Sequence, residues 1–310
     1  MPTWLSGGLL RTTEMAALAS ARMLGRGDAD RVKVLAASAM LHALEESGFA
    51  ARVVLGPRGD PMLSHGSTVG VGTLAQVDLA VYPVEGASLV ARGSANAISV
   101  AVAVEGGDFP TPPAVWYMDK IIVGPAARGA IDLEDTIADN LRRVAFSRDA
   151  RVSDLVVAVL DRPRHLELLE EIRASGARVL LLEEGEIAGA LMAALDGTGV
   201  DAMIGVGGLQ ETIISACAVR CLGGELQARL WPRNEEERLL AGDQLTRVYG
   251  IADLSPAAVT MAVTGVSGGQ LLDGVWFGAH WSETNSVSMS SKLGTVRRIT
   301  TRHHRLGDSG

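Results

Sequence analysis

The chain of 310 residues contains only two cysteines, and aromatic residues make up only 4% of it. Cys217 and Cys221 lie four residues apart on an expected helix, a spacing that matches no zinc pattern. We therefore interpret both cysteines as small core residues. The 36 glycines are consistent with tight turns and a closely packed backbone.

The sequence also lacks an excess of basic residues and a long apolar run. Its net charge of -8 argues against a general nucleic-acid partner. No apolar run reaches the roughly 20 residues that span a membrane, and residues 1–5 show no signal-peptide pattern. Hydrophobic residues at 47% and charged residues at 21% are typical of a globular chain. We expect a cytoplasmic protein with no membrane partner.

From about residue 150 onward, strand and helix patterns alternate. Three mostly apolar strands are each followed by a helix, which favours a parallel sheet covered by helices. The expected strands are 154–160, 178–182 and 201–206, and the expected helices are 165–174, 186–195 and 211–222. Ligands of such sheets bind beyond the carboxyl ends of the strands. The segments at those ends are 161–165, 183–186 and 207–211.

The first half contains one stretch that points to a ligand. Residues 77–82 have the composition of a buried strand, and we expect Pro83 to end it. Gly86, Ala87 and Ser88 then open a short helix, whose first N–H groups are suited to an anion. We expect an α+β domain over 1–150, an α/β domain over 151–310, and the site in the cleft between them.

The residues Tyr82-Pro-Val-Glu-Gly-Ala87 resemble the Asp-Pro-Ile-Asp/Glu-Gly-Thr signature of the lithium-sensitive sugar and inositol phosphatases. Further short matches follow in order, and they make the chain similar to the class II fructose-1,6-bisphosphatases, bacterial enzymes that use Mg²⁺ or Mn²⁺. These matches include Gly25-Arg-Gly-Asp28, Ser94-Ala-Asn-Ala97, Tyr117-Met118, Ile122-Val-Gly-Pro125, Pro163-Arg-His165 and Gly205-Val-Gly-Gly208. The resemblance implies an α/β fold, the layered αβαβα sandwich of this superfamily, and a homo-oligomer.

By this resemblance, the residues that hold sugar and phosphate survive. The family's Lys-Pro-Arg-His stands here as Arg162-Pro-Arg164-His165, and its tyrosine matches Tyr117. The family's Asp-Gly-Asp, which holds sugar hydroxyls, corresponds to Glu184-Gly-Glu186. A guanidinium fork suits a phosphate better than an ammonium does. We expect a small phosphorylated or anionic metabolite as the ligand, with Gly86, Ala87 and Ser88 also in contact with it.

By the same resemblance, the hydrolytic residues are largely replaced. The family's metal carboxylates fall on Lys33, Pro57, Tyr82 and Glu211, of which only Glu211 is an acid. Glu85 remains, and Asp60 in the shortened loop 56–60 is a candidate for the acid that the loop has lost. The resemblance implies that phosphate-ester hydrolysis in this superfamily needs hard cations held by several carboxylates. We therefore expect no resident metal, with Glu85 and Glu211 as the weak residual ligands.

Each candidate also has a simpler interpretation. Lys33 could replace the cation of the family's site, or it could be a solvated charge on a helix face. Tyr82 could be an acid, or it could fill the space that the ions left. Glu211 could serve the site or only favour the start of its helix. His165 is interpreted as structural, orienting the turn that carries the two arginines.

Three hypotheses for function remain open. In the first, the pocket is kept for metal-independent acid–base chemistry, with Lys33, Tyr82, Glu85, Glu211 and Asp60 as catalytic candidates and no cofactor. In the second, the protein is a non-catalytic pseudophosphatase that binds a ligand or a partner, for example an intact relative. In the third, it is a residual phosphatase, the one case that requires Mg²⁺. Fold alone does not select among them.

Overall fold

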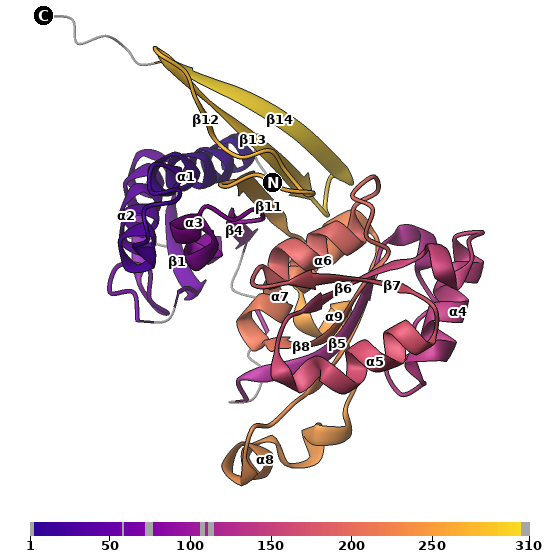
Figure 1. Cartoon of the computed structure of the whole chain (residues 1–310). Coiled ribbons are helices and arrows are strands. Elements are labelled where there is room, and N and C mark those ends of the chain that lie inside the picture. Colours follow the sequence, from indigo (N-terminus) through magenta and orange to yellow (C-terminus); the bar gives the residue numbers. More distant parts are fainter. Residues whose placement is uncertain (1–2, 58, 72–76, 106–108, 111–114, 305–310) are drawn as a thin grey trace, which may run out of the picture. The chain divides into compact units, whose positions relative to one another are not determined.

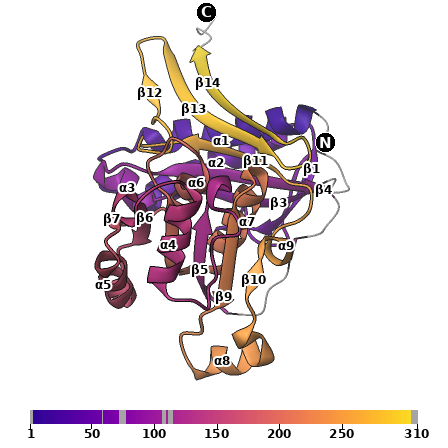
Figure 2. The ribbon, with the colours of Figure 1, turned by 90° about the vertical axis from the view of Figure 1, so that its right-hand side faces the viewer.

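The computed structural model describes residues 3–57, 59–71, 77–105, 109–110 and 115–304, and it consists of two compact units (Figures 1 and 2). Unit 1 comprises Met1–Asp108 and Ala258–Gly310, and unit 2 comprises Phe109–Ala257. Each unit contains one mixed sheet with helices, so the chain is an α/β protein, consistent with a sandwich phosphatase fold. Arg58, within the loop 56–60 singled out above, lies outside the described residues.

The eight-stranded sheet of unit 1 has the order β12-β13-β11-β4-β3-β1-β2, with β14 paired to β13. Its strands are β1 (Ala50–Leu55), β2 (Thr68–Gly70), β3 (Val77–Glu85), β4 (Ile98–Glu105), β11 (Thr260–Gly265), β12 (Trp276–Phe277), β13 (Trp281–Ser290) and β14 (Thr295–His304). β11 pairs antiparallel with both β4 and β13. The last part of the chain therefore completes the sheet that the first part begins.

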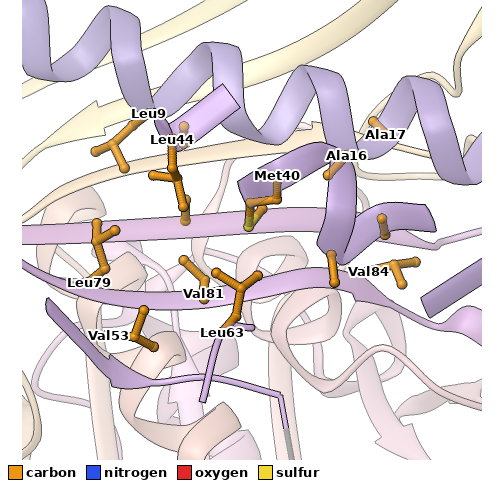
Figure 3. Packing of buried hydrophobic residues seen from close by; sticks show 14 of the residues in the cluster. Leu9, Ala16, Ala17, Met40, Leu44, Val53, Leu63, Leu79, Val81 and Val84 are labelled. Carbon is orange, nitrogen blue, oxygen red and sulfur yellow. The ribbon is translucent and has the colours of Figure 1, made fainter. Parts of the chain in front are cut away.

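Two long helices of unit 1, α1 (Thr3–Ala21) and α2 (Ala29–Glu46), pack against this sheet. Asp28 caps α2 by accepting a 2.8 Å hydrogen bond from the N–H of Arg31. Figure 3 shows Leu9 of α1 and Met40 and Leu44 of α2 directed toward the strand residues of the same core. Burial of these apolar side chains is the main force that holds the helices on the sheet.

One strand of unit 1 differs from expectation. β3 continues through Pro83 to Glu85 instead of ending before the proline. The pairing of β3 with β4 shifts register between Tyr82 and Glu85, and this irregularity accommodates a residue that cannot donate to the ladder.

The six-stranded sheet of unit 2 has the order β10-β9-β5-β8-β6-β7. Its strands are β5 (Tyr117–Val123), β6 (Val156–Leu160), β7 (Arg178–Leu182), β8 (Ala202–Gly208), β9 (Glu225–Leu230) and β10 (Tyr249–Gly250). β6 is parallel to both β7 and β8, which confirms the three expected strand–helix repeats. β5 is inserted antiparallel between β8 and β9.

Helices cover both faces of the unit 2 sheet. α4 (Ile137–Ser147) and α5 (Leu166–Ala174) share a core with Ala202 and Ile204 of β8. α6 (Glu186–Ala194) places Gly189 against Met203, which points to the opposite face because side chains alternate along a strand. α7 (Leu209–Leu222) and α9 (Ile251–Leu254) follow β8 and β10, and α8 (Glu235–Ala241) follows β9. α3 (Ala87–Arg92) belongs to unit 1.

The division into units differs from the expected boundary at residue 150. Residues 109–150 belong to unit 2, because β5 pairs with β8 and β9. Residues 258–310 belong to unit 1, because β11 pairs with β4. Both pairings join segments that lie far apart in the sequence. The local composition of a segment does not predict which distant strand it pairs with. The expected position of the site in a cleft between domains stays a prediction.

Candidate functional site

Four strands of unit 2 end at one edge of its sheet, and a fifth begins there. β6, β7, β8 and β9 reach this edge with their carboxyl ends. β5 begins there because it runs the other way, and its Tyr117 lies opposite Gly208 at the end of β8. The structure therefore brings together the three segments expected at strand ends, and it adds the beginning of β5 and the segment after β9.

Arg162 and Arg164 follow β6 at this edge. Nη1 of Arg162 donates to the carbonyl oxygens of Asp161 and Glu183 at 2.7 and 2.8 Å, so Arg162 connects the ends of β6 and β7. Nη2 and Nε of Arg164 donate to the carbonyl oxygen of Val206 at 2.9 and 3.3 Å. All of these bonds go to neutral carbonyl oxygens, so they do not compensate the positive charge of either arginine. Two fixed guanidinium groups are suited to an anionic ligand.

His165 has the structural role that the sequence indicated. Its Nδ1 lies 2.7 Å from the carbonyl oxygen of Leu160, and its Nε2 accepts a 2.9 Å hydrogen bond from the N–H of Val206. This arrangement requires the neutral tautomer with the proton on Nδ1. Burial lowers the pKa of His165, which keeps the ring neutral. The ring holds the turn after β6 against β8 and so positions Arg164.

Glu186, expected to contact sugar hydroxyls, forms a buried ion pair with Lys120. The Lys120 side chain is 1% exposed and that of Glu186 is 8% exposed. Lys120 also donates to the Thr212 hydroxyl at 3.0 Å, and Oε2 of Glu186 accepts the N–H of Gly208 at 2.8 Å. The pair therefore joins β5, α6 and the start of α7. Sequence reasoning missed Lys120, because a lysine inside a strand pattern carries no signal of its burial.

Gly207 and Gly208 leave room for two carboxylates. A Cβ atom at Gly207 would lie 2.1 Å from Oε2 of Glu186, and a Cβ atom at Gly208 would lie 2.0 Å from Oε2 of Glu211. Glu211 is half-buried in the first turn of α7, where the helix dipole favours a negative charge. Glu184 is also half-buried, just after the end of β7. Three of the expected acidic residues thus lie at the same edge.

Tyr117 lies near side chains of the segments that follow β6 and β9. The guanidinium of Arg164 lies 5.1 Å from the centroid of its ring, and that of Arg233 lies 5.8 Å from it. Trp231, just after β9, meets the Tyr117 ring edge-on at 6.2 Å between centroids. Arg233 and Trp231 are further residues that sequence reasoning missed. The run 231–238 offers only a general signal, an Asn234 cap followed by three glutamates.

Most of the candidate site residues of unit 1 lie where β3 ends and α3 begins. β3 ends at Glu85, and Gly86, with φ of 84°, precedes the six-residue helix α3, in which Ala87 and Ser88 are the first residues. Glu85 is 4% exposed, and Tyr82 is half-buried at the register shift of the same strand. The structure confirms the strand-to-helix junction. Its binding of an anion stays a prediction.

Lys33 and Asp60 have local partners in unit 1. Nζ of Lys33 donates to Asp30 at 3.1 Å, and the Lys33 side chain is 62% exposed. This geometry agrees with the simpler interpretation, a solvated charge on a helix face. Oδ1 of Asp60 accepts the N–H groups of Met62 and Leu63 at 2.8 and 3.0 Å, an arrangement typical of an Asx turn.

Two mixed sheets with helices define the chain as an α/β protein. One edge of the unit 2 sheet carries arginine and carboxylate side chains at its strand ends, where ligands of such sheets bind. No helix in the described part of the chain is long and apolar enough to cross a membrane. Comparison with known proteins gives the family.

The chain belongs to the family described as bacterial fructose-1,6-bisphosphatase, glpX-encoded, whose model matches residues 4–303. It is 35% identical over 315 residues to fructose-1,6-bisphosphatase 1 class 2 of Escherichia coli (strain K12), covering 95% of this chain and 93% of the relative. The fructose-1,6-bisphosphatases class 2 of Escherichia coli O6:H1 and of Shigella flexneri match to the same extent. The relationship to class II fructose-1,6-bisphosphatases suggested by the motifs is thereby confirmed.

Family membership corrects one expectation. We expected no cofactor, but class II fructose-1,6-bisphosphatases are metal-dependent phosphatases, and their match to nearly the whole chain points to a metal cofactor. The donor set does not by itself fit a metal, since no group of three or more His, Cys, Asp or Glu side chains gathers within the described ranges. Divalent cations such as Mg²⁺ bind through one or two carboxylates plus water and substrate phosphates. Glu85 in unit 1 and Glu211 in unit 2 each stay a predicted ligand.

Proposed function

We propose that the protein is a metal-dependent sugar-phosphate phosphatase of the class II fructose-1,6-bisphosphatase type. The observation that carries this proposal is the pair of guanidinium groups at the carboxyl ends of the unit 2 strands, Arg162 and Arg164, each held by backbone carbonyl oxygens. Arg164 also stacks on Tyr117. This arrangement supports binding of a phosphorylated ligand, and the family supports fructose-1,6-bisphosphate as the first substrate to test.

In this proposal, the chain's own residues bind and orient the substrate. Arg162 and Arg164 neutralise a phosphate, and their bonds to the backbone fix their direction before the ligand arrives. Tyr117 supplies a hydroxyl beside them, and Glu184 accepts hydrogen bonds from sugar hydroxyls. A bound divalent metal would activate water and offset the charge of the transferred group. Glu85 of unit 1 and Glu211 of unit 2 would each be a carboxylate available to such a metal.

The test is release of inorganic phosphate from fructose-1,6-bisphosphate with Mg²⁺ or Mn²⁺, and with EDTA in place of the metal. We expect turnover with metal and none with EDTA. Replacement Arg164→Met should lower affinity about tenfold or more, since hydrogen bonds to charged groups contribute about 1.5–3 kcal/mol. The control Arg142→Met removes an equally charged but exposed side chain that pairs with Asp139. Turnover that persists unchanged in EDTA would contradict the proposal.

A second function is favoured by a specific observation in unit 1. The resemblance implies that the family's metal positions fall on Lys33, Pro57 and Tyr82, and the structure pairs Lys33 with Asp30. We therefore also propose, as the alternative, a sugar-phosphate-binding protein without turnover. Binding of fructose-1,6-bisphosphate with no phosphate release under any metal condition would favour this alternative. The cytoplasmic location, the homo-oligomer and an intact relative as partner remain predictions.

A further inference from the structure

A cavity of about 530 Å³ in unit 2 is lined by the loop 128–134, by residues 224–227 at the start of β9, and by residues 248–251 around β10. Its volume is within the roughly 300–1,000 Å³ of small-molecule sites. The candidate functional site lies beyond the other, carboxyl end of β9, after Leu230. Successive strand residues are about 3.3 Å apart, so roughly 17 Å of β9 separates the two places. The cavity is therefore distinct from the candidate functional site.

Two side chains of β9 hold the loop wall of this cavity in place. Oε1 of Gln227 accepts the N–H of Leu133 at 2.9 Å, and its Nε2 donates to the carbonyl oxygen of Ile131 at 2.9 Å. The same Nε2 donates to Oε1 of Glu225 at 3.0 Å, and Oε2 of Glu225 accepts the N–H of Gly129 at 2.5 Å. These hydrogen bonds fix the wall before a ligand arrives, which lowers the cost of ordering it on binding.

The charged residues that line the cavity are three acids and one base: Asp132, Glu134, Glu225 and Arg128. Oδ1 of Asp132 accepts the N–H of Glu134 at 3.0 Å, and Glu225 accepts the two neutral donors named above. In the part of the chain that the structure describes, none of these four side chains forms an ion pair with another side chain. Their charges are therefore available to a ligand.

These charges indicate the class of the ligand. Three carboxylates repel a phosphate and attract cationic groups, and the net charge of -8 of the whole chain adds to this attraction. The guanidinium of Arg128 is suited to a carboxylate, which it binds through two parallel hydrogen bonds. A complementary ligand therefore carries one carboxylate and two cationic groups. A basic amino acid has this pattern, whereas a sugar phosphate has the opposite charge.

We propose that this cavity is a binding site for a small basic amino acid. The carboxylate of the ligand binds Arg128, and its cationic groups bind Glu225 and the acids of the loop, Asp132 and Glu134. Gln227 is a positioning residue, since it holds both Glu225 and the loop. This inference is independent of the proposed function, because it concerns another place in the unit and a ligand of another charge.

The experiment measures binding to the whole protein by calorimetry at neutral pH. The probes are L-arginine and agmatine, its analogue without the carboxylate, and the proteins are wild type, Glu225→Gln, Glu134→Gln and Arg128→Met. We expect L-arginine to bind the wild type more tightly than agmatine does. Glu225→Gln should weaken both probes about tenfold or more, since a hydrogen bond to a charged group is lost. Arg128→Met should weaken L-arginine about tenfold and leave agmatine unchanged.

The matched controls are Glu170→Gln and Arg173→Met, which remove exposed charges of α5 and should bind L-arginine like the wild type. Thermal unfolding of each variant identifies any loss of fold. If Glu225→Gln does not fold, Glu134→Gln carries the test, because the exposed Glu134 side chain should weaken binding by a smaller factor.

Two results would overturn the inference. One is the absence of L-arginine binding to the wild type at millimolar concentration, and the other is binding that is unchanged in the acidic-residue variants and in Arg128→Met. Agmatine that binds as tightly as L-arginine would overturn the assignment to an amino acid, since Arg128 would then contribute no contact with a carboxylate.

Discussion

Lys120 and Glu186 form a buried ion pair that ties three elements of the candidate site together. Lys120 comes from β5, three residues after Tyr117, and Glu186 starts α6, two residues after Glu184. Through Thr212 and the N–H of Gly208, the same pair holds the first turn of α7. The pair contacts β5, which carries Tyr117, α6, which begins two residues after Glu184, and α7, which carries Glu211. We therefore expect it to preserve the spacing of these three residues.

Replacing Lys120 by methionine should destabilise the protein strongly. The change leaves the Glu186 carboxylate buried without its cation, and breaking a buried pair in this way costs about 3–5 kcal/mol. The double variant Lys120→Met/Glu186→Gln should recover part of this loss, since neither charge then remains buried alone. Urea unfolding measures both, and Lys292→Met, an exposed lysine, should change the free energy of unfolding by less than about 1 kcal/mol. Equal losses in Lys120→Met and in the double variant would contradict this account.

An alanine at Gly207 should be destabilising despite its small size. The added Cβ would lie 2.1 Å from the Glu186 carboxylate, and Glu186 cannot move away without leaving Lys120. Overpacking of this kind costs about 1–3 kcal/mol. Gly7→Ala is the matched control, because Gly7 lies in α1 with no atom near its added Cβ, and alanine should stabilise a helix by about 0.5–1 kcal/mol. Chemical unfolding of the two variants should therefore give changes of opposite sign.

The neutral state of His165 should make the fold sensitive to acid. Burial lowers the pKa of His165 below the value near 6.5 of an unfolded chain. As the pH falls through that value, the unfolded state takes up a proton that the folded state does not, so stability present above pH ~6.5 is lost. The free energy of unfolding, measured from pH 7.5 to 5, should fall less steeply in His165→Gln. Exposed His280→Gln is the control, and an unchanged slope in His165→Gln would rule out this linkage.

The Cys217 thiol should be unreactive in the folded protein. It is completely buried, and burial raises its pKa to about 12, so almost no thiolate exists at neutral pH. An aromatic disulfide reagent at pH 8 should label neither Cys217 nor the buried Cys221 until denaturant is added. The variant Ser147→Cys, at an exposed position, provides a thiol that should react at once. Rapid labelling of the wild type under native conditions would show that the α7 core opens readily.

Much of the candidate site was predictable because its residues follow strands with clear local patterns. Arg162, Arg164, Glu184 and Glu211 were all expected at strand ends, and the structure brings those ends to one edge. Arg233 was not expected, because its place depends on β9 pairing with β5 across more than a hundred residues. Glu186 was expected to be available for a ligand, but its burial against Lys120 depends on a side chain of another strand.

The sequence by itself determined the strand–helix repeats, the family, the structural role of His165 and the two cysteines as core residues. Each of these depends on patterns within a short segment or on ordered short motifs. Only the tertiary structure decided which segments share a sheet: residues 109–150 joined unit 2, and residues 258–310 returned to unit 1. The reason is physical, since strand pairing is made by backbone groups that every residue has, and a partner is chosen by the packing of the whole unit.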